Sequence, residues 1–114
     1  QWYNSLTRFH GKLWAQGSGK PTKQDLKKAD YIYKGRAWVM NRYNFQTPES
    51  KPYKKDVLIQ YYNNYIYHVK EYFRHRPDDL LVLNVSSDDA YLRLCEFVDV
   101  ESDRTTFPWE NKTD

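Results

Sequence analysis

Ser5 is the first residue of the chain whose type and position suggest a ligand contact. The spacing of apolar residues places it in the first turn of a helix, where backbone N–H groups are unpaired and the helix dipole favours an anion. A serine hydroxyl there can hold a phosphate together with those amides, and Arg8, one turn further along, can add positive charge. By local physics alone, a serine in a first turn is more often only a capping residue.

The glycine-rich stretch Gly17-Ser18-Gly19-Lys20 invites comparison with a phosphate-binding loop of the pattern GxxxxGK[ST]. The comparison fails at two positions. Trp14 stands where the first glycine is required, and Pro21 stands where a serine or threonine is required. The residues before the stretch also predict a helix rather than a strand, so we interpret it as a plain turn.

The histidines and the single cysteine do not predict a metal site. His10, His68 and His75 have no metal-ligand spacing. We expect His68 to be a structural residue among apolar neighbours, and His10 and His75 to lie on the surface. Because Cys95 is the single cysteine, an internal disulfide and a cysteine-based metal site are ruled out. The apolar helical residues around it predict that it lies in the core.

Two N-glycosylation patterns occur, at Asn84-Val85-Ser86 and at Asn111-Lys112-Thr113. The first falls in a segment that we predict to be a buried strand, which makes it a coincidence. The second can be used only in a secretory compartment.

The chain shows no signal peptide and no apolar run that approaches a membrane span. The lack of a signal peptide and the single cysteine together favour a cytoplasmic location. A location in the secretory pathway or the Golgi lumen stays open as the alternative.

The composition is that of one small domain with a half-polar interior. The chain has 114 residues, of which 39% are hydrophobic, and its 11 tyrosines and 4 tryptophans make it rich in aromatic rings. A mean hydropathy of -0.99 is low for a self-sufficient globule. The chain begins without methionine on what already predicts a helix. We therefore expect a segment that depends on further protein.

The charge fits an anionic ligand but does not demand one. The net charge is +3 and the isoelectric point is near 8.9, values that many ordinary domains share. Basic and aromatic residues together can also indicate nucleic acid. Here the aromatic residues follow the spacing of a helical core, so we expect no nucleic-acid partner.

Periodicity predicts a mostly helical chain. A first helix runs from about Trp2 to Trp14, and Thr22 with Asp25 marks the start of a second helical stretch, broken near Gly35, that reaches about Arg42. The other predicted elements are a loop over residues 44–52, a long helix over about 53–73 that stops at Arg76-Pro77-Asp78, and a short helix from Ser87-Asp88-Asp89 to about Val98.

One strand is predicted, over about residues 80–85, where a short apolar run without alternation is bounded by Pro, Asp and Ser. A single strand cannot satisfy its own backbone groups, and the chain offers it no partner. We therefore expect the sheet to be supplied by other residues.

The motifs from residue 65 onward resemble the C-terminal part of the sulfotransferases that use the nucleotide sulfate donor PAPS (3′-phosphoadenosine 5′-phosphosulfate). The resemblance rests on the order and spacing of residues 65–73, 76–85, 94–98 and 107–112, and on the opening residues 1–6. In that family these segments form a long helix, a sheet strand, a short helix ending in an LCEFL-like run and an FPxxNK-like segment. Residues 11–60 match only loosely.

The resemblance implies an α/β chain, the C-terminal part of a P-loop-like, three-layer parallel-sheet fold. It implies that residues 1–114 are one part of a single sulfotransferase domain whose N-terminal half, with the phosphate-cradling loop, a lysine and the usual catalytic base, lies outside this sequence. Ser5 stands where the family has a serine that binds the 3′-phosphate of the donor. The arginine that acts with it would precede residue 1.

The implied function is transfer of a sulfuryl group from PAPS to a hydroxyl or amine acceptor, with PAP as product and no metal. Ser5 is the main cofactor-binding residue, Arg8, Asn111 and Lys112 are weaker candidates, and no catalytic residue is expected in this segment, which alone should be inactive. Two other functions stay open. One is a non-enzymatic helical interaction module, and the other is a related nucleotide kinase-like transferase with the same architecture.

Overall fold

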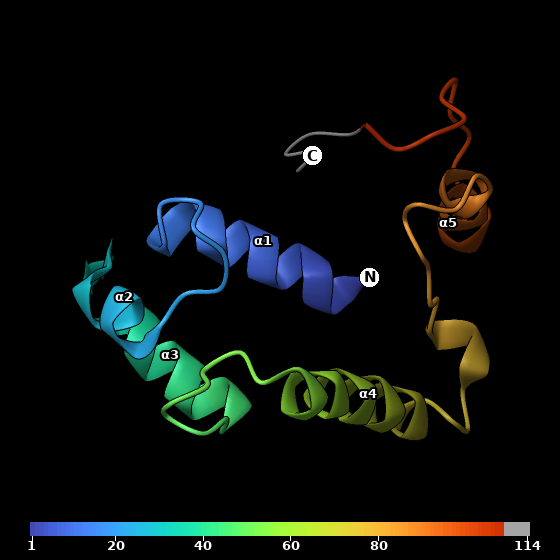
Figure 1. Cartoon of the computed structure of the whole chain (residues 1–114). Coiled ribbons are helices and arrows are strands. Elements are labelled where there is room, and N and C mark those ends of the chain that lie inside the picture. The colour runs from blue at the N-terminus through green and yellow to red at the C-terminus, as the bar shows by residue number, and fades with distance from the viewer. Residues whose placement is uncertain (109–114) are drawn as a thin grey trace. The chain divides into compact units, whose positions relative to one another are not determined.

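The computed structural model describes residues 1–108 (Figure 1). Its elements are α1 (Trp2–Trp14), α2 (Lys23–Lys28), β1 (Asp30–Tyr31), β2 (Tyr33–Lys34), α3 (Arg36–Phe45), α4 (Lys55–Tyr72), the 3₁₀ helix η1 (Pro77–Asp79) and α5 (Ala90–Val98). The chain divides into two compact units, a first unit of Gln1–Tyr67 and a second unit that begins at His68.

Helix α1 has the bounds predicted from the sequence. Tyr3 is buried on it, and Leu6, His10 and Trp14 are half-buried at spacings of three and four residues, which places them on one face. The prediction that His10 lies on the surface was therefore wrong, because it shares the inward face of the helix with the aromatic residues.

The glycine-rich turn closes α1 and folds back along it. The carbonyl oxygen of Gly11 accepts hydrogen bonds from the amides of Ala15 and Gly17, at 2.9 and 3.0 Å. Gly17 and Gly19 have φ values of 78° and 103°, in the region that favours glycine. The stretch is a turn, as predicted, and its conformation serves the return of the chain to α2.

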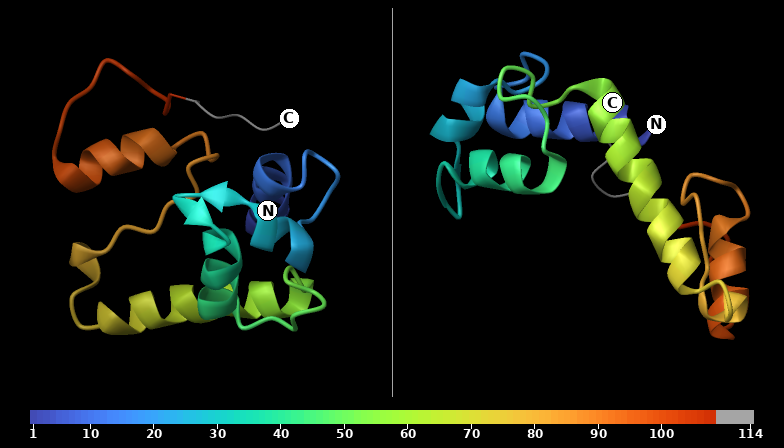
Figure 2. Two further views of the ribbon diagram at one scale, coloured as in Figure 1. Left: turned by 90° about the vertical axis from the view of Figure 1, so that its left-hand side faces the viewer. Right: turned by 90° about the horizontal axis from the view of Figure 1, so that it is seen from below.

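The second helical stretch is three elements rather than one. Thr22 and Asp25 form the predicted capping box at the start of α2, since the Thr22 side chain accepts from the Asp25 amide and the Asp25 carboxylate accepts from the Thr22 amide. The strands β1 and β2 then pair as a short antiparallel hairpin between α2 and α3 (Figure 2). Gly35, with a φ of 88°, precedes α3.

The first unit has a small core between its helices. Its fully or nearly fully buried apolar residues are Tyr3, Leu26, Ala37, Tyr53 and Leu58. The Tyr3 hydroxyl donates to the carbonyl oxygen of Tyr53 at 2.9 Å, which satisfies a buried polar group across fifty residues of sequence. The core therefore ties α1 to the segment that leads into α4.

A polar network fixes the loop between α3 and α4. The buried side chain of Asn41 donates to the carbonyl oxygen of Pro52 at 3.0 Å, and the Thr47 hydroxyl donates to the same oxygen at 2.9 Å. Arg42 reaches the Thr47 hydroxyl at 2.7 Å. Because these groups satisfy one another, the Pro-bearing loop has a defined path although it lacks regular structure.

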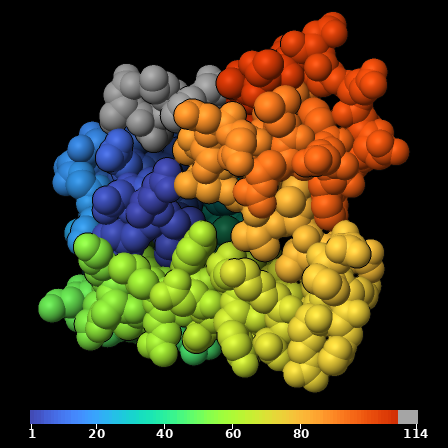
Figure 3. All heavy atoms as spheres, turned by 90° about the vertical axis from the view of Figure 1, so that its right-hand side faces the viewer, coloured from blue at the N-terminus to red at the C-terminus, as the bar shows by residue number. Residues whose placement is uncertain are grey.

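Helix α4 confirms the predicted long helix, with a start two residues later than expected. Of its apolar face, Leu58 is buried, whereas most of the tyrosines are exposed, and the exposed fraction of Tyr65 reaches 61%. His68, which we expected among apolar neighbours, is exposed too. The atoms of α4, coloured green to yellow, form part of the surface in Figure 3.

The predicted strand over residues 80–85 was wrong. Leu80 has an extended backbone, with φ of -124° and ψ of 127°, but the segment has no ladder partner within the described residues, and a strand requires one. Leu80, Leu81 and Leu83 are half-buried, while Asn84 is exposed and its side chain accepts from the Ser86 amide at 3.1 Å. The reason for dismissing the Asn84 glycosylation pattern, burial in a strand, therefore does not hold.

Helix α5 is the short helix predicted near the end of the chain. Most of its residues are apolar. In the described part of the second unit, however, Ala90 is the one fully buried residue. Tyr91 contacts Phe107 edge-on at 5.1 Å, and its hydroxyl lies 2.7 Å from that of Ser102. Cys95 is a free thiol and half-buried rather than fully in a core. No described helix meets the length and hydropathy of a membrane span.

Candidate functional site

The Ser5 hydroxyl is exposed near the start of α1 and makes no hydrogen bond within residues 1–108. Ser5 is the fourth residue of the helix, and its own amide donates to the Gln1 carbonyl at 3.1 Å. The amides that lack an intrahelical acceptor are thus those of Trp2, Tyr3 and Asn4. The hydroxyl and these amides lie within one turn of each other, and together they can bind an anionic oxygen.

The electrostatics of this helix start favour an anion. No acidic residue lies in the first turn of α1, and the side chain of the N-cap residue Gln1 makes no capping hydrogen bond. The ammonium groups of Lys20 and Lys55 lie 5.2 and 5.7 Å from the centroid of the Tyr3 ring, one in the glycine-rich turn and one at the start of α4. These two cations lie against the ring of the buried Tyr3, and the helix dipole adds a partial positive charge at the start of α1.

The weaker candidates have different outcomes. Arg8 is exposed on α1, one turn after Ser5, and makes no hydrogen bond or ion pair within residues 1–108. Asn111 and Lys112 lie outside the described residues, as does the second glycosylation pattern. Sequence reasoning missed Lys20 and Lys55, because only the fold brings the turn and the start of α4 to Tyr3.

Sequence reasoning also missed a buried pair formed by His10 and Tyr53. The Nδ1 atom of His10 lies 2.8 Å from the Tyr53 hydroxyl. Burial lowers the pKa of His10 to about 4 and raises the pKa of Tyr53, so both are neutral at physiological pH. The spacing of His10 from Tyr3 and Trp14, seven and four residues, is the sequence signal that could have indicated its inward orientation.

The pair predicts a loss of stability in mild acid. The pKa of His10 falls from 6.5 in the unfolded chain to about 4 in the folded one, so protons bind the unfolded state more tightly. This contribution to stability is full well above pH 6.5 and declines as the pH falls toward 4, by about 1 kcal/mol between pH 7.5 and pH 5 after allowance for the solvent that still reaches the half-buried ring. Urea unfolding at the two pH values measures the decline.

In the variant His10→Gln, the unfolding free energy should fall much less between pH 7.5 and pH 5. In His75→Gln, which changes an exposed histidine, it should fall as much as in the unmodified protein. An equal decline in both variants and in the unmodified protein would assign the acid sensitivity to other groups.

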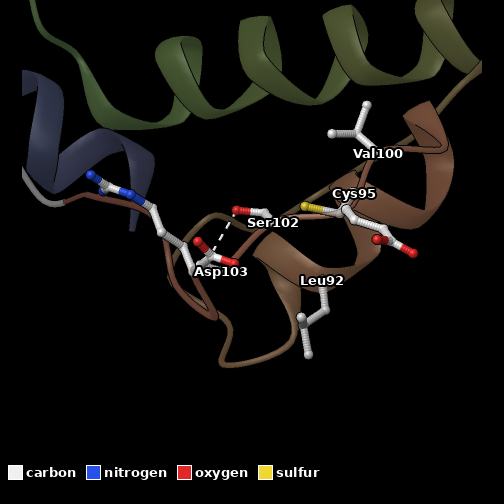
Figure 4. Close-up of a pocket in the computed structure, with 7 residues that line it drawn as sticks. Leu92, Cys95, Val100, Ser102 and Asp103 are labelled. Carbon is white, nitrogen blue, oxygen red and sulfur yellow. Dashed lines mark hydrogen bonds between the residues drawn. The ribbon is translucent and has the colours of Figure 1, made fainter.

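The second unit contains an open hollow of about 690 Å³ around Cys95 (Figure 4). Its lining combines the thiol with two carboxylates, Glu101 and Asp103, and with Arg104, whose amide donates to the Ser102 hydroxyl at 3.2 Å. No partner within the hollow activates the thiol, and a thiol without such a partner does not define a reaction. No group of three potential metal ligands is present among the described residues.

A family model described as a sulfotransferase domain matches residues 1–114, the whole of the chain. The chain belongs to the sulfotransferase domain family. The family inferred from the ordered motifs is thereby confirmed, and membership implies a transferase of sulfuryl groups with a P-loop-like architecture, a donor and an acceptor. No curated protein and no solved structure matches this sulfotransferase chain.

Within the sulfotransferase chain, the residues that sequence reasoning chose and the residues that the fold assembles overlap only in part. Ser5 is exposed at the start of α1, and the two lysines that the fold adds, Lys20 and Lys55, lie against the Tyr3 ring. The exposed hydroxyl, the first-turn amides and the lack of an acidic residue in that turn are features that an anionic ligand can use.

Proposed function

We propose that this chain is the part of a PAPS-dependent sulfotransferase that binds the 3′-phosphate of the donor through Ser5 and the first turn of α1. The observation behind the proposal is the exposed hydroxyl of Ser5, which makes no hydrogen bond within residues 1–108 and lies at a helix start whose first turn has no acidic residue. A dianionic phosphate there accepts hydrogen bonds from the hydroxyl and the amides and is attracted by the helix dipole.

We further propose that the chain is the C-terminal part of the domain and that its second unit completes a sheet formed by residues outside this sequence. The extended backbone of Leu80 and the lack of a ladder partner for residues 80–85 within the described chain support this, because the segment can join a neighbouring strand. The exposed apolar side chains of α5, among them Leu92 and Val98, support it as well.

In sulfuryl transfer the acceptor oxygen or nitrogen attacks the sulfur in line while the nucleotide phosphate leaves. The contribution of this chain is binding and orientation, since a donor held at its 3′-phosphate presents its sulfuryl group in a fixed position. The donor supplies the activated sulfuryl group. The groups that act on it belong to the other half of the domain, so the isolated chain is expected to be inactive.

Nucleotide binding to the full-length gene product tests the proposal. Isothermal titration with PAP, 5′-AMP and ATP compares nucleotides with and without the 3′-phosphate. We expect PAP to bind at least about tenfold more tightly than 5′-AMP, the value of one or two charge-assisted hydrogen bonds. Equal affinities for PAP and 5′-AMP would contradict the proposal, preference for ATP would favour a kinase-like transferase, and no binding would favour the interaction module.

A further inference from the structure

A pocket of about 400 Å³ lies in the first unit, next to the His10–Tyr53 pair. We call it the Tyr53 pocket. Its lining comes from α1, the hairpin, α3 and the segment before α4 and consists of Phe9, His10, Leu13, Trp14, Tyr31, Ala37, Met40, Asn41, Asn44, Phe45 and Tyr53. A cavity of this size, lined mainly by aromatic and aliphatic side chains with a few polar groups, is typical of small-molecule sites.

The charge of the lining limits the ligand. Charged residues make up 29% of the chain, yet none of the residues that line the Tyr53 pocket is Asp, Glu, Lys or Arg. His10 is neutral because of its burial, and Tyr53 keeps its proton. An ion that entered this pocket would lose water without gaining a countercharge, which is costly. The lining therefore favours an uncharged ligand.

Two polar groups in the pocket are available to a ligand. The Tyr53 hydroxyl and His10 Nδ1 share a hydrogen bond at 2.8 Å, and in the tautomer in which the hydroxyl donates, the imidazole proton is on Nε2. Neither His10 Nε2 nor the side-chain amide of Asn44 has a hydrogen-bond partner in residues 1–108, whereas the amide of Asn41 is used by Pro52. A ligand oxygen can accept from His10 Nε2 or from Asn44.

The aromatic walls favour a ring system. His10 lies 4.5 Å from Trp14 and 5.7 Å from Tyr53, measured between ring centroids, and Trp14 meets Tyr31 edge-on at 5.8 Å. These rings form a continuous surface at which a planar ligand can stack or pack edge to face. We propose that the Tyr53 pocket binds an uncharged, mainly aromatic small molecule that has a hydroxyl or carbonyl oxygen. The proposal is independent of the donor site at Ser5.

Isothermal titration of the full-length protein with 2-naphthol, an uncharged bicyclic phenol, tests the ligand class. We expect saturable 1:1 binding, and binding of the anion 2-naphthoate at least about tenfold weaker because its charge would be buried without a partner. Absence of 2-naphthol binding, or equal affinities for the two compounds, would overturn the proposal.

Substitutions at the pocket rim test the location. Leu13 lines the pocket yet is 51% exposed, so Leu13→Trp can obstruct it without changing the core, and Asn44→Trp does the same from α3. The matched control is Val39→Trp, also on α3, 52% exposed and outside the lining. We expect both rim variants to weaken 2-naphthol binding at least about tenfold by steric exclusion. Undiminished binding in a folded rim variant, or an equal loss in Val39→Trp, would overturn the assignment.

The polar anchor has its own readout. His10→Phe keeps a ring in the wall but removes Nε2, so the preference of the protein for 2-naphthol over naphthalene should fall about three- to tenfold, the value of one neutral hydrogen bond. An unchanged preference would exclude His10 as the group that contacts the ligand oxygen.

Discussion

Replacing Gly11 with alanine is expected to lower the free energy of unfolding by about 2–4 kcal/mol, a large part of the stability of a small domain. A Cβ atom at Gly11 would lie 3.1 Å from the carbonyl carbon of Gly19 and still closer to its oxygen, so the helix and the returning turn would have to separate. The better helix propensity of alanine offsets only about 1 kcal/mol of this cost. Urea unfolding followed by circular dichroism measures the change.

Gly17→Ala is the matched control within the same turn. Gly17 has a φ of 78°, and a Cβ atom there has nothing within 4 Å, so alanine meets backbone strain but no clash. We expect a loss of about 1 kcal/mol. If Gly11→Ala is no more destabilising than Gly17→Ala, then the close approach of the turn to α1 does not contribute to stability.

The close packing at Gly11 illustrates which features could be predicted from the sequence and which could not. Local signals gave α1, the capping box of Thr22 and Asp25, and α4, because periodicity and caps act within a few residues. The contact between Gly11 and Gly19 depends on how the turn returns, which no local pattern encodes. The hairpin Asp30–Lys34 was missed for a similar reason, since two residues per strand are too few to show alternation.

The error at residues 80–85 has a different cause. The apolar run does predict an extended backbone, and Leu80 adopts one, but a strand is completed by hydrogen bonds to a neighbour that the described chain does not provide. Composition can therefore predict the conformation of such a segment and not its pairing.

In the candidate site, the sequence predicted Ser5 through its place on a helix start. It did not predict that Lys20 and Lys55 lie against Tyr3, or that Tyr53 lies against His10. The partners in each of these contacts are far apart in the sequence, and only the folding of the first unit brings them together. His10 was predicted to lie on the surface, whereas its spacing from Tyr3 and Trp14 is that of the inward face of α1.

Ser5→Ala in the full-length protein is expected to weaken PAP binding about 10- to 100-fold. The substitution removes one hydrogen bond to a doubly charged phosphate, and such bonds contribute about 1.5–3 kcal/mol. Because Ser5 is exposed and its hydroxyl contacts nothing within residues 1–108, the unfolding free energy should stay within about 0.5 kcal/mol of that of the unmodified protein. A loss of binding without a loss of stability would therefore identify a contact to the ligand.

Thr7→Ala is the matched control for Ser5→Ala. Thr7 lies on the same helix, but its hydroxyl already donates to the carbonyl oxygen of Tyr3 at 3.0 Å and so is not available to a phosphate. The affinity for PAP should remain within about twofold in this variant, which corresponds to less than 0.5 kcal/mol.

The most direct measurement compares PAP with 5′-AMP in the unmodified protein and in Ser5→Ala, because the two nucleotides differ only in the 3′-phosphate. If Ser5 contacts that phosphate, the variant loses affinity for PAP and keeps its affinity for 5′-AMP, so the preference for PAP falls at least about tenfold. If the variant keeps the full preference for PAP, or loses affinity for both nucleotides alike, the start of α1 is not the 3′-phosphate site.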